Sequence, residues 1–274
     1  MQSHGKNCAA VLKGKHDVDL LYLNDPDIRA HQVRVAVQTS AICGTQIGEW
    51  NLSRGPDPYL PHCFGHEAVG EVLEIGGEVD GVAVGDRVVI SWMKASADCH
   101  APPKFTDESG AGVNFGQCCT FVTRGVFPEN RVFKIDESIP KDSAALLGCA
   151  LLTAYAALKC VTFASNGERC EIAIVGAGGV GLSVAALCQT FEWSAVCVDT
   201  PEVTANLEMQ DLGFQFVSTE MAKAQRVGKH PIVIVCTGAQ LAFELAETLL
   251  PQNGGKMLIV GNPPYGTKVG LDIK

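Results

Sequence analysis

The sequence predicts an α/β protein with two domains, a barrel-like β domain followed by a doubly wound parallel sheet. Short β-type runs bounded by Gly, Pro and Asp fill the first half, which is typical of a barrel. Beyond them, short β-type runs alternate with helical stretches, which indicates a parallel sheet. A glycine-rich turn follows one of these later strands. We therefore predict domains at residues 1–150 and 151–274.

Length and composition narrow the class of protein before any motif is considered. The chain has 274 residues, of which 47% are hydrophobic and 19% charged, so it can bury a core in each domain and is not disordered. Its formal net charge is −9, which disfavours binding to nucleic acid or to anionic membranes.

The cysteines do not indicate a disulfide scaffold, although there are twelve of them. The chain is long, and residues 1–15 lack the apolar region of a secretory signal. Cys8, Cys160, Cys188 and Cys197 lie in apolar stretches and are expected to be small buried hydrophobic residues. We therefore expect a reducing, cytoplasmic location and no membrane partner.

The first half reads as strands separated by turns. Residues 33–37 alternate with polar neighbours, 68–75 form a valine- and leucine-rich strand, and 88–90 follow a Gly-Asp-Arg turn. Residues 95–116 contain proline, glycine and mixed charge with little periodicity, so we expect a long loop there.

The second half begins with a helix and continues as alternating elements. Residues 144–159 are rich in alanine and leucine and are predicted to be helical. The expected strands that follow are residues 171–175, 195–199, 231–236 and 256–260.

A dinucleotide site is predicted where the strand ending at Val175 runs into Gly176-Ala-Gly178-Gly-Val-Gly181, with a helix expected to start near Leu182. Glycines are needed at the tight turn, at the approach to a pyrophosphate and where helix packs on strand. The helix N-terminus offers free N–H groups to phosphates. The same stretch is nearly all apolar, but its glycines and short length argue against a membrane span.

An acid lies at the end of the next strand, as this type of site requires. The carboxylate of Asp199 can accept hydrogen bonds from ribose hydroxyls and repel a 2′-phosphate. Thr200 and Pro201 follow, without an arginine to bind that phosphate, so we expect NAD rather than NADP.

Three separate residues are candidate metal ligands. Cys43 follows a predicted strand, His66 precedes another, and Cys149 lies near the predicted linking helix. Two thiolates and one imidazole can hold zinc and leave a fourth position open. Glu67 is a further candidate, either as a transient ligand or as a neighbour that orients the ligands.

The motifs together resemble the zinc-containing medium-chain alcohol dehydrogenase family, over essentially the whole chain. They are Cys43-Gly-Thr45, Gly65-His66-Glu67, Gly85-Asp-Arg-Val88, Gly148-Cys149 with Thr153, and the glycine-rich turn 176–181. The resemblance implies a GroES-like β-barrel domain followed by a Rossmann domain. It also implies an oxidoreductase that transfers hydride between an alcohol or polyol-type substrate, or the matching aldehyde or ketone, and NAD.

The resemblance also assigns roles to particular residues. It implies one catalytic zinc held by Cys43, His66 and Cys149, and a hydroxyl at Thr45 that takes the proton of the substrate alcohol. The cofactor-binding residues that we carry over are Thr153, Gly176, Gly178, Gly179, Val180, Gly181, Asp199 and Thr237. Thr153 and Val180 match positions that pack near the nicotinamide.

Two positions near the candidate ligands depart from the family pattern. Gln46 stands where the family usually has an aspartate that orients the zinc-bound imidazole, and an amide adds no charge there. Gly48 lies near the position of a histidine that ends the proton relay in some members, so protons must leave by another route.

The remaining departures concern a second zinc and the C-terminus. Cys99, His100, Cys118 and Cys119 are too irregularly spaced for the four-cysteine structural zinc of many members, so none is expected. The chain stops at Lys274, where members usually continue, and residues 270–273 are expected to begin the last sheet strand. A homodimer through the edge of the Rossmann sheet stays open.

Two alternative functions remain open at this level. One is a metal-free quinone or enone reductase on the same fold, which the presence of Cys43, His66 and Cys149 disfavours. The other is a non-catalytic or weakly active dinucleotide-binding relative, which Gln46 and Gly48 favour.

Trp50 and Trp92 are expected either to line a substrate pocket or to be partly buried aromatic residues. His62 is expected to be structural.

Overall fold

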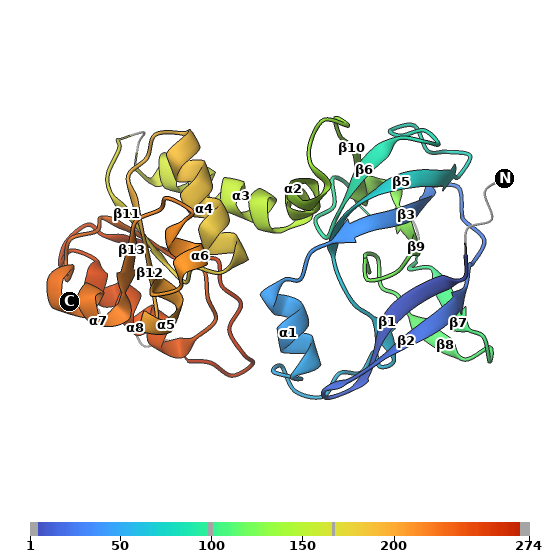
Figure 1. Cartoon of the computed structure of the whole chain (residues 1–274), viewed down its shortest axis with the longest axis horizontal. Coiled ribbons are helices and arrows are strands. Elements are labelled where there is room, and N and C mark those ends of the chain that lie inside the picture. The colour runs from blue at the N-terminus through green and yellow to red at the C-terminus, as the bar shows by residue number, and fades with distance from the viewer. Residues whose placement is uncertain (1–4, 98–100, 166–167, 269–274) are drawn as a thin grey trace. The chain divides into compact units, whose positions relative to one another are not determined.

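The structure is a computed structural model that describes residues 5–97, 101–165 and 168–268. The chain divides into two compact units, Met1–Cys149 and Ala150–Lys274. Figure 1 shows the first unit in blue to green and the second in yellow to red. Each unit has its own apolar core and its own type of sheet.

The first unit contains a closed barrel and a separate five-stranded sheet. The barrel strands, in spatial order, are β1 (Asn7–Gly14), β2 (Asp17–Asn24), β7 (Lys104–Asp107), β8 (Gly112–Asn114) and β4 (His62–Cys63). The sheet strands, in spatial order, are β10 (Val132–Lys134), β6 (Arg87–Ser91), β5 (Glu67–Ile75), β3 (Gln32–Ser40) and β9 (Arg124–Pro128). Valine and phenylalanine side chains from both sheets fill one core, which holds them together.

Short helices lie between or after these strands. They are α1 (Gly44–Trp50), α2 (Lys141–Ala145) and the 3₁₀ turns η1 (Glu129–Arg131) and η2 (Leu146–Gly148). Helix α1 begins directly after the segment that leaves β3, and α2 packs on the sheet through Ala144 and Ala145 beside Val69.

The expectation of a long loop over residues 95–116 was wrong, because β7 and β8 form an antiparallel hairpin inside it. Phe105 and Val113 point inward and are buried, and the Asp107 carboxylate accepts the N–H groups of Ser109 and Ala111 in the turn. Each strand is only three or four residues long, so its alternation was too short to recognise.

The single helix expected over residues 144–159 is broken. α2 and η2 end before Cys149, whose φ of −145° and ψ of −69° are not helical, and α3 (Ala150–Ala164) then begins. Gly148 lies so close to β6 that a Cβ there would come 2.3 Å from the Ile90 carbonyl oxygen. The Ser91 hydroxyl donates to the Gly148 carbonyl at 2.7 Å, which takes the place of a helical hydrogen bond.

The second unit has a parallel five-stranded sheet. Its strands, in spatial order, are β13 (Phe216–Ser218), β12 (Ala195–Asp199), β11 (Ile172–Val175), β14 (Ile232–Val235) and β15 (Lys256–Ile259). The helices after α3 are α4 (Gly179–Thr190), α5 (Pro201–Thr204), α6 (Leu207–Gln210), α7 (Thr219–Gln225) and α8 (Gln240–Leu249). The predicted order of strands and helices is confirmed, and β13 is an additional strand.

Alternate residues of the central strands face two different helical layers. Ile172 and Ile174 of β11 pack with side chains of α3 and α4, whereas Ala173 and Val175 pack with side chains of α7 and α8. All four residues of β11 are buried, as expected for a sheet covered on both faces. Because helices cover both faces of the sheet, the loops that follow the strands lie at the carboxyl ends of the strands.

Two smaller expectations in this unit were wrong. Helix α4 begins at Gly179 and not near Leu182, because Gly178 is its N-cap and Gly179 and Val180 already have helical geometry. Cys160 is exposed on α3, whereas Cys188 and Cys197 are buried as expected. The apolar stretch around Cys160 belongs to a helix, and one face of such a helix remains outside the core.

Among the described residues, no single helix is long and apolar enough to cross a membrane. Lys141–Gly148 and Ala150–Phe163 reach that length and hydropathy only when taken together, as a bent pair.

Candidate functional site

Four potential metal-ligating side chains meet in the first unit. Cys43 precedes α1, His66 precedes β5, Glu67 begins β5, and Cys149 follows η2. Their ligand atoms all lie within 4.8 Å of one another. Tetrahedral zinc with bond lengths near 2.1–2.3 Å needs ligand atoms about 3.5–3.8 Å apart, so small side-chain adjustments suffice.

Two glycines let the chain bring these ligands together. Gly65 has a φ of +90°, and a Cβ there would lie 2.4 Å from the Thr120 hydroxyl. Only glycine therefore allows the turn that precedes His66. A Cβ at Gly148 would lie 3.0 Å from the Glu67 Cα, so glycine also allows the segment before Cys149 to approach β5.

The cluster is partly open to solvent. Glu67 and Cys149 are buried, whereas Cys43 and His66 are half-buried. Hydrogen bonding to Cys149 is the largest cause of a pKa near 3 for the Cys43 thiol, with help from the His66 imidazole and the Thr45 backbone. A thiolate is the form of cysteine that binds metals. The Thr45 hydroxyl oxygen lies 3.8 Å from the Cys43 sulfur, at the edge of the cluster.

His66 provides a direct test of whether a metal fits here. Its Nδ1 lies 2.7 Å from the Gln46 side-chain nitrogen, whereas its Nε2 is buried and has no hydrogen-bond partner among the residues that the structure describes. A buried polar atom without a partner costs free energy unless something occupies the position in front of it. Because thiols surround this atom, the donor set fits zinc.

Sequence reasoning missed the residues that hold the backbone of the His66–Glu67 segment. The Ser40 and Thr120 hydroxyls donate to the Glu67 carbonyl at 2.8 and 3.3 Å. The Cys118 thiol donates to the His66 carbonyl at 3.5 Å. Cys118 and Thr120 are neighbours in the chain but distant from both Ser40 and His66, and none of the three belongs to a motif, so no local signal could have identified this role.

The other candidates near the cluster have separate roles. His62 is structural, because its Nε2 lies 2.9 Å from the Asp57 carboxylate. The Cys119 thiol donates to the Cys63 carbonyl at 3.0 Å. Trp50 and Trp92 are 42% and 46% exposed, and Trp50 packs against the His16 ring at 4.4 Å between ring centres. Cys99 and His100, considered above for a structural zinc, lie outside the described residues.

The glycine-rich turn of the second unit has two kinds of glycine. Gly176 has a φ of +101°, and a Cβ at Gly181 would come 1.9 Å from the Gly176 carbonyl oxygen, so these two are required by the fold. A Cβ at Gly178 or Gly179 would meet no atom within 4 Å. These two leave open space at the N-terminus of the twelve-residue helix α4, which fits the approach of a pyrophosphate.

Asp199 lies beside this turn, at the end of β12. One carboxylate oxygen accepts the N–H of Ala177 at 2.6 Å and the other accepts the N–H of Thr200 at 2.7 Å. Each carboxylate oxygen can accept a second hydrogen bond, so ribose hydroxyls can still donate to them. Neighbouring Thr237 packs against Gly176, whose Cβ would lie 3.0 Å from that of Thr237. Val180 is half-buried on α4 and Thr153 half-buried on α3.

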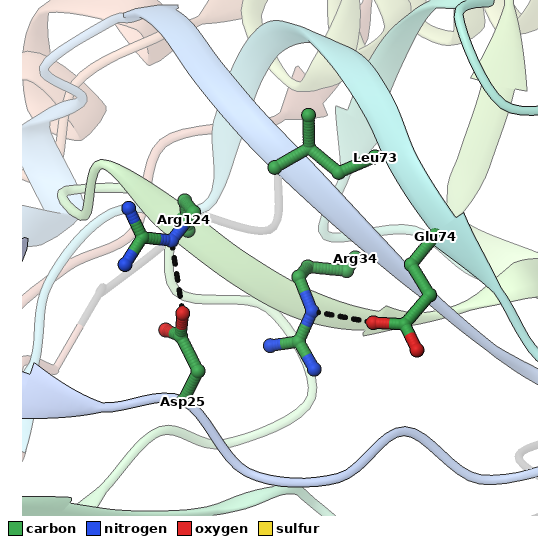
Figure 2. Close-up of a pocket in the computed structure, with 5 residues that line it drawn as sticks. All are labelled: Asp25, Arg34, Leu73, Glu74 and Arg124. Carbon is green, nitrogen blue, oxygen red and sulfur yellow. Dashed lines mark hydrogen bonds and ion pairs between the residues drawn. The ribbon is translucent and has the colours of Figure 1, made fainter. Parts of the chain in front are cut away.

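A separate surface pocket of about 420 Å³ on the first unit is lined by residues of β3, β5 and β9 and by Asp25, which follows β2. Figure 2 shows that its charged side chains pair with one another, Arg34 with Glu74 at 2.8 Å and Arg124 with Asp25 at 2.9 Å. Because two cations meet two anions, the pocket carries no net charge, and none of these residues is part of the metal-ligand cluster.

Comparison with known proteins supports the same type of architecture. Residues 29–141 match the alcohol dehydrogenase GroES-like domain. Benzyl alcohol dehydrogenase of Acinetobacter calcoaceticus has a similar structure, with a TM-score of 0.78 and 25% identity over 98% of this chain and 81% of that chain. A GroES-like domain joined to a parallel Rossmann sheet defines the medium-chain dehydrogenase/reductase class.

Relatives in sequence specify the family within that class. L-threonine 3-dehydrogenase of Shewanella frigidimarina is 30% identical, over 95% of this chain and 78% of that protein. Alcohol dehydrogenase of Geobacillus stearothermophilus is 28% identical, over 93% of this chain and 77% of that protein. The chain belongs to the zinc-containing medium-chain alcohol dehydrogenase family, which confirms the resemblance noted from its motifs.

Proposed function

We propose that this chain is a zinc-dependent, NAD-linked oxidoreductase that transfers hydride between an alcohol or polyol-type substrate, or the matching carbonyl compound, and NAD. The observation that carries the proposal is the convergence of Cys43, His66 and Cys149, with their ligand atoms within 4.8 Å. Relatives named alcohol dehydrogenase and L-threonine 3-dehydrogenase support the substrate class.

The first unit has the residues for substrate activation. Cys43, His66 and Cys149 would hold zinc, and the Glu67 carboxylate is close enough to serve as a transient ligand. Zinc bound there supplies a Lewis acid for the substrate oxygen, and bound NAD supplies the hydride acceptor. The Thr45 hydroxyl is assigned to take the proton of the substrate alcohol. Gly48 has no side chain to continue a relay, so Thr45 passes the proton to solvent.

The second unit has the residues for NAD. Gly176, Gly178, Gly179 and Gly181 are assigned to the pyrophosphate turn, and Asp199 to the ribose hydroxyls. Preference for NAD follows from the negative charge of Asp199, which repels the 2′-phosphate of NADP. We assign Thr153 and Val180 to the nicotinamide side of the cofactor, and Thr237, which packs against Gly176, to cofactor binding at the glycine-rich turn.

The proposal includes one zinc ion per chain and a homodimer. Strand β15 lies at one edge of the second sheet, and the Ile259 side chain on it is 50% exposed. We propose that a second copy pairs along this edge, because an edge strand is a template for pairing with another chain. Sedimentation velocity of the full chain tests this part, because a monomer at micromolar concentration would contradict it.

The enzyme assignment is tested by metal analysis together with a substrate screen. We expect one zinc per chain and formation of NADH with a member of a panel of primary alcohols, polyols and sugar derivatives. Lack of turnover with zinc and NAD both bound would instead support a non-catalytic dinucleotide-binding protein. Reduction of an enone by zinc-free protein would support a metal-free reductase.

A further inference from the structure

One buried side-chain amide contacts two members of the metal-ligand cluster. The Gln46 side-chain oxygen accepts the backbone N–H of Cys43 at 3.0 Å, and its nitrogen lies 2.7 Å from His66 Nδ1. Gln46 is only 5% exposed, so water cannot replace either contact. The amide orientation is therefore set by these two neighbours.

The direction of these hydrogen bonds determines the position of the proton on His66. A backbone N–H can only donate, so the amide atom that faces Cys43 must be the oxygen. The other amide atom is then the NH₂ group, which also only donates, and His66 Nδ1 must accept from it. A neutral imidazole that accepts at Nδ1 carries its proton at Nε2.

This tautomer is the wrong one for a metal ligand. Nε2 is the ring nitrogen left without a hydrogen bond in the cluster, and it needs a free lone pair to bind a metal. With the lone pair at Nε2, the ring proton moves to Nδ1 and faces the NH₂ group of Gln46. If the amide turns over to accept that proton, its NH₂ group faces the N–H of Cys43. Either arrangement leaves two donors in contact.

We propose that Gln46 is a positioning residue that holds His66 in the tautomer with its proton on Nε2. Metal binding at Nε2 therefore breaks one of the two Gln46 hydrogen bonds. The inference rests on the proposed zinc function and adds a reason for weakened metal binding. Its effect acts through His66, because the amide group that faces Nδ1 is the NH₂ group, which only donates and cannot itself bind a cation.

Gln46→Glu tests the inference because glutamate has the same length and two acceptor oxygens. It can accept from Cys43 N–H and His66 Nδ1–H at the same time, so zinc affinity of the full chain should rise about 10–100-fold. Competition with a chromophoric chelator measures the affinity for zinc ions. An affinity within threefold of the wild type would overturn the inference.

Ile47→Glu is the matched control for charge. Ile47 follows Gln46 on α1 and is 54% exposed, so a glutamate there adds the same charge without the hydrogen bonds. We expect its zinc affinity to change less than threefold. A gain equal to that of Gln46→Glu would assign the effect to charge and overturn the inference.

The tautomer itself is measured without zinc, NAD or substrate. Long-range ¹H–¹⁵N spectra of the metal-free wild type should show the His66 proton on Nε2, and those of Gln46→Glu should show it on Nδ1. A proton on Nδ1 in the wild type would overturn the inference even if the variant failed to fold. An inactive enzyme with the expected tautomer would count only against the proposed function.

Discussion

The carboxylate of Asp199 accepts the backbone N–H of Ala177 at 2.6 Å, which joins the end of β12 to the glycine-rich turn after β11. The acid therefore holds the conformation of the turn before any cofactor binds. Its second oxygen accepts the Thr200 N–H, so the side chain is fixed at the carboxyl end of β12. One residue thus shapes the glycine-rich turn and also carries the charge that we propose selects NAD over NADP.

Replacement of Asp199 should alter cofactor choice. Asp199→Asn keeps the size of the side chain and removes the charge that repels a 2′-phosphate, together with one of the two backbone hydrogen bonds, because an amide nitrogen cannot accept an N–H. We expect the ratio of kcat/KM for NADP to that for NAD to rise by about tenfold, or about 1.4 kcal/mol. Asp211→Asn, at an exposed acid of the same unit, should leave the ratio unchanged. An unchanged ratio in Asp199→Asn would show that the acid does not select the cofactor.

Loss of a metal ligand should separate zinc binding from NAD binding. Cys43→Ala and His66→Ala each remove one of the three proposed ligands, so zinc affinity should fall more than about 100-fold and turnover should be lost. NAD affinity, measured by calorimetry, should stay within about twofold because the turn belongs to the other compact unit. Cys160→Ala, at an exposed thiol, should retain zinc. Full zinc content in either ligand variant would refute the assigned site.

The two kinds of glycine in the turn should respond differently to a methyl group. Gly181→Ala places its Cβ 1.9 Å from the Gly176 carbonyl oxygen, so we expect the free energy of unfolding to fall by about 1–3 kcal/mol. Gly178→Ala meets no atom within 4 Å and should leave unfolding unchanged.

In Gly178→Ala the methyl group occupies the approach of the pyrophosphate, and NAD affinity should fall about tenfold. Urea unfolding and NAD titration of both variants measure the two effects. Wild-type NAD affinity in Gly178→Ala would contradict the assigned phosphate position.

His230 should make the second unit less stable in acid. Its side chain is fully buried, and burial lowers its pKa below 6.5, while Glu171 at 3.3 Å partly opposes the shift. As the pH falls below about 6.5, the unfolded chain takes up a proton that the folded chain does not. The unfolded state is then favoured, so the contribution of His230 to stability is complete above this range and declines below it.

Thermal unfolding between pH 7.5 and pH 5 measures this dependence. His230→Gln removes the titrating group, and we expect its Tm to fall less over the same range. An NMR titration of the wild type should place the midpoint of His230 below 6.5, the ordinary pKa of a histidine. A midpoint above it would reverse the expected sign.

Local sequence patterns predicted most of the fold because their causes are local. The run from Ile172 to Gly181 contains a buried strand, a turn with positive φ and a helix start, and each needs particular residue types at neighbouring positions. The hairpin β7–β8 was not predicted, since its short strands gain their stability from Phe105 and Val113 in a shared core. The break at Cys149 depends on contact between Gly148 and β6, which helix propensity does not describe.

The sequence by itself determined the family, the two types of sheet and the residues that could bind zinc and NAD. Their spacing and residue types are local properties, and they are readable without coordinates. Only the tertiary structure decided that ligand atoms from Cys43, His66, Glu67 and Cys149 lie within 4.8 Å, and that the Gln46 side-chain nitrogen lies 2.7 Å from His66 Nδ1. Distances and hydrogen-bond directions between residues remote in sequence depend on how the strands and turns pack. They therefore cannot be read from patterns of neighbouring residues.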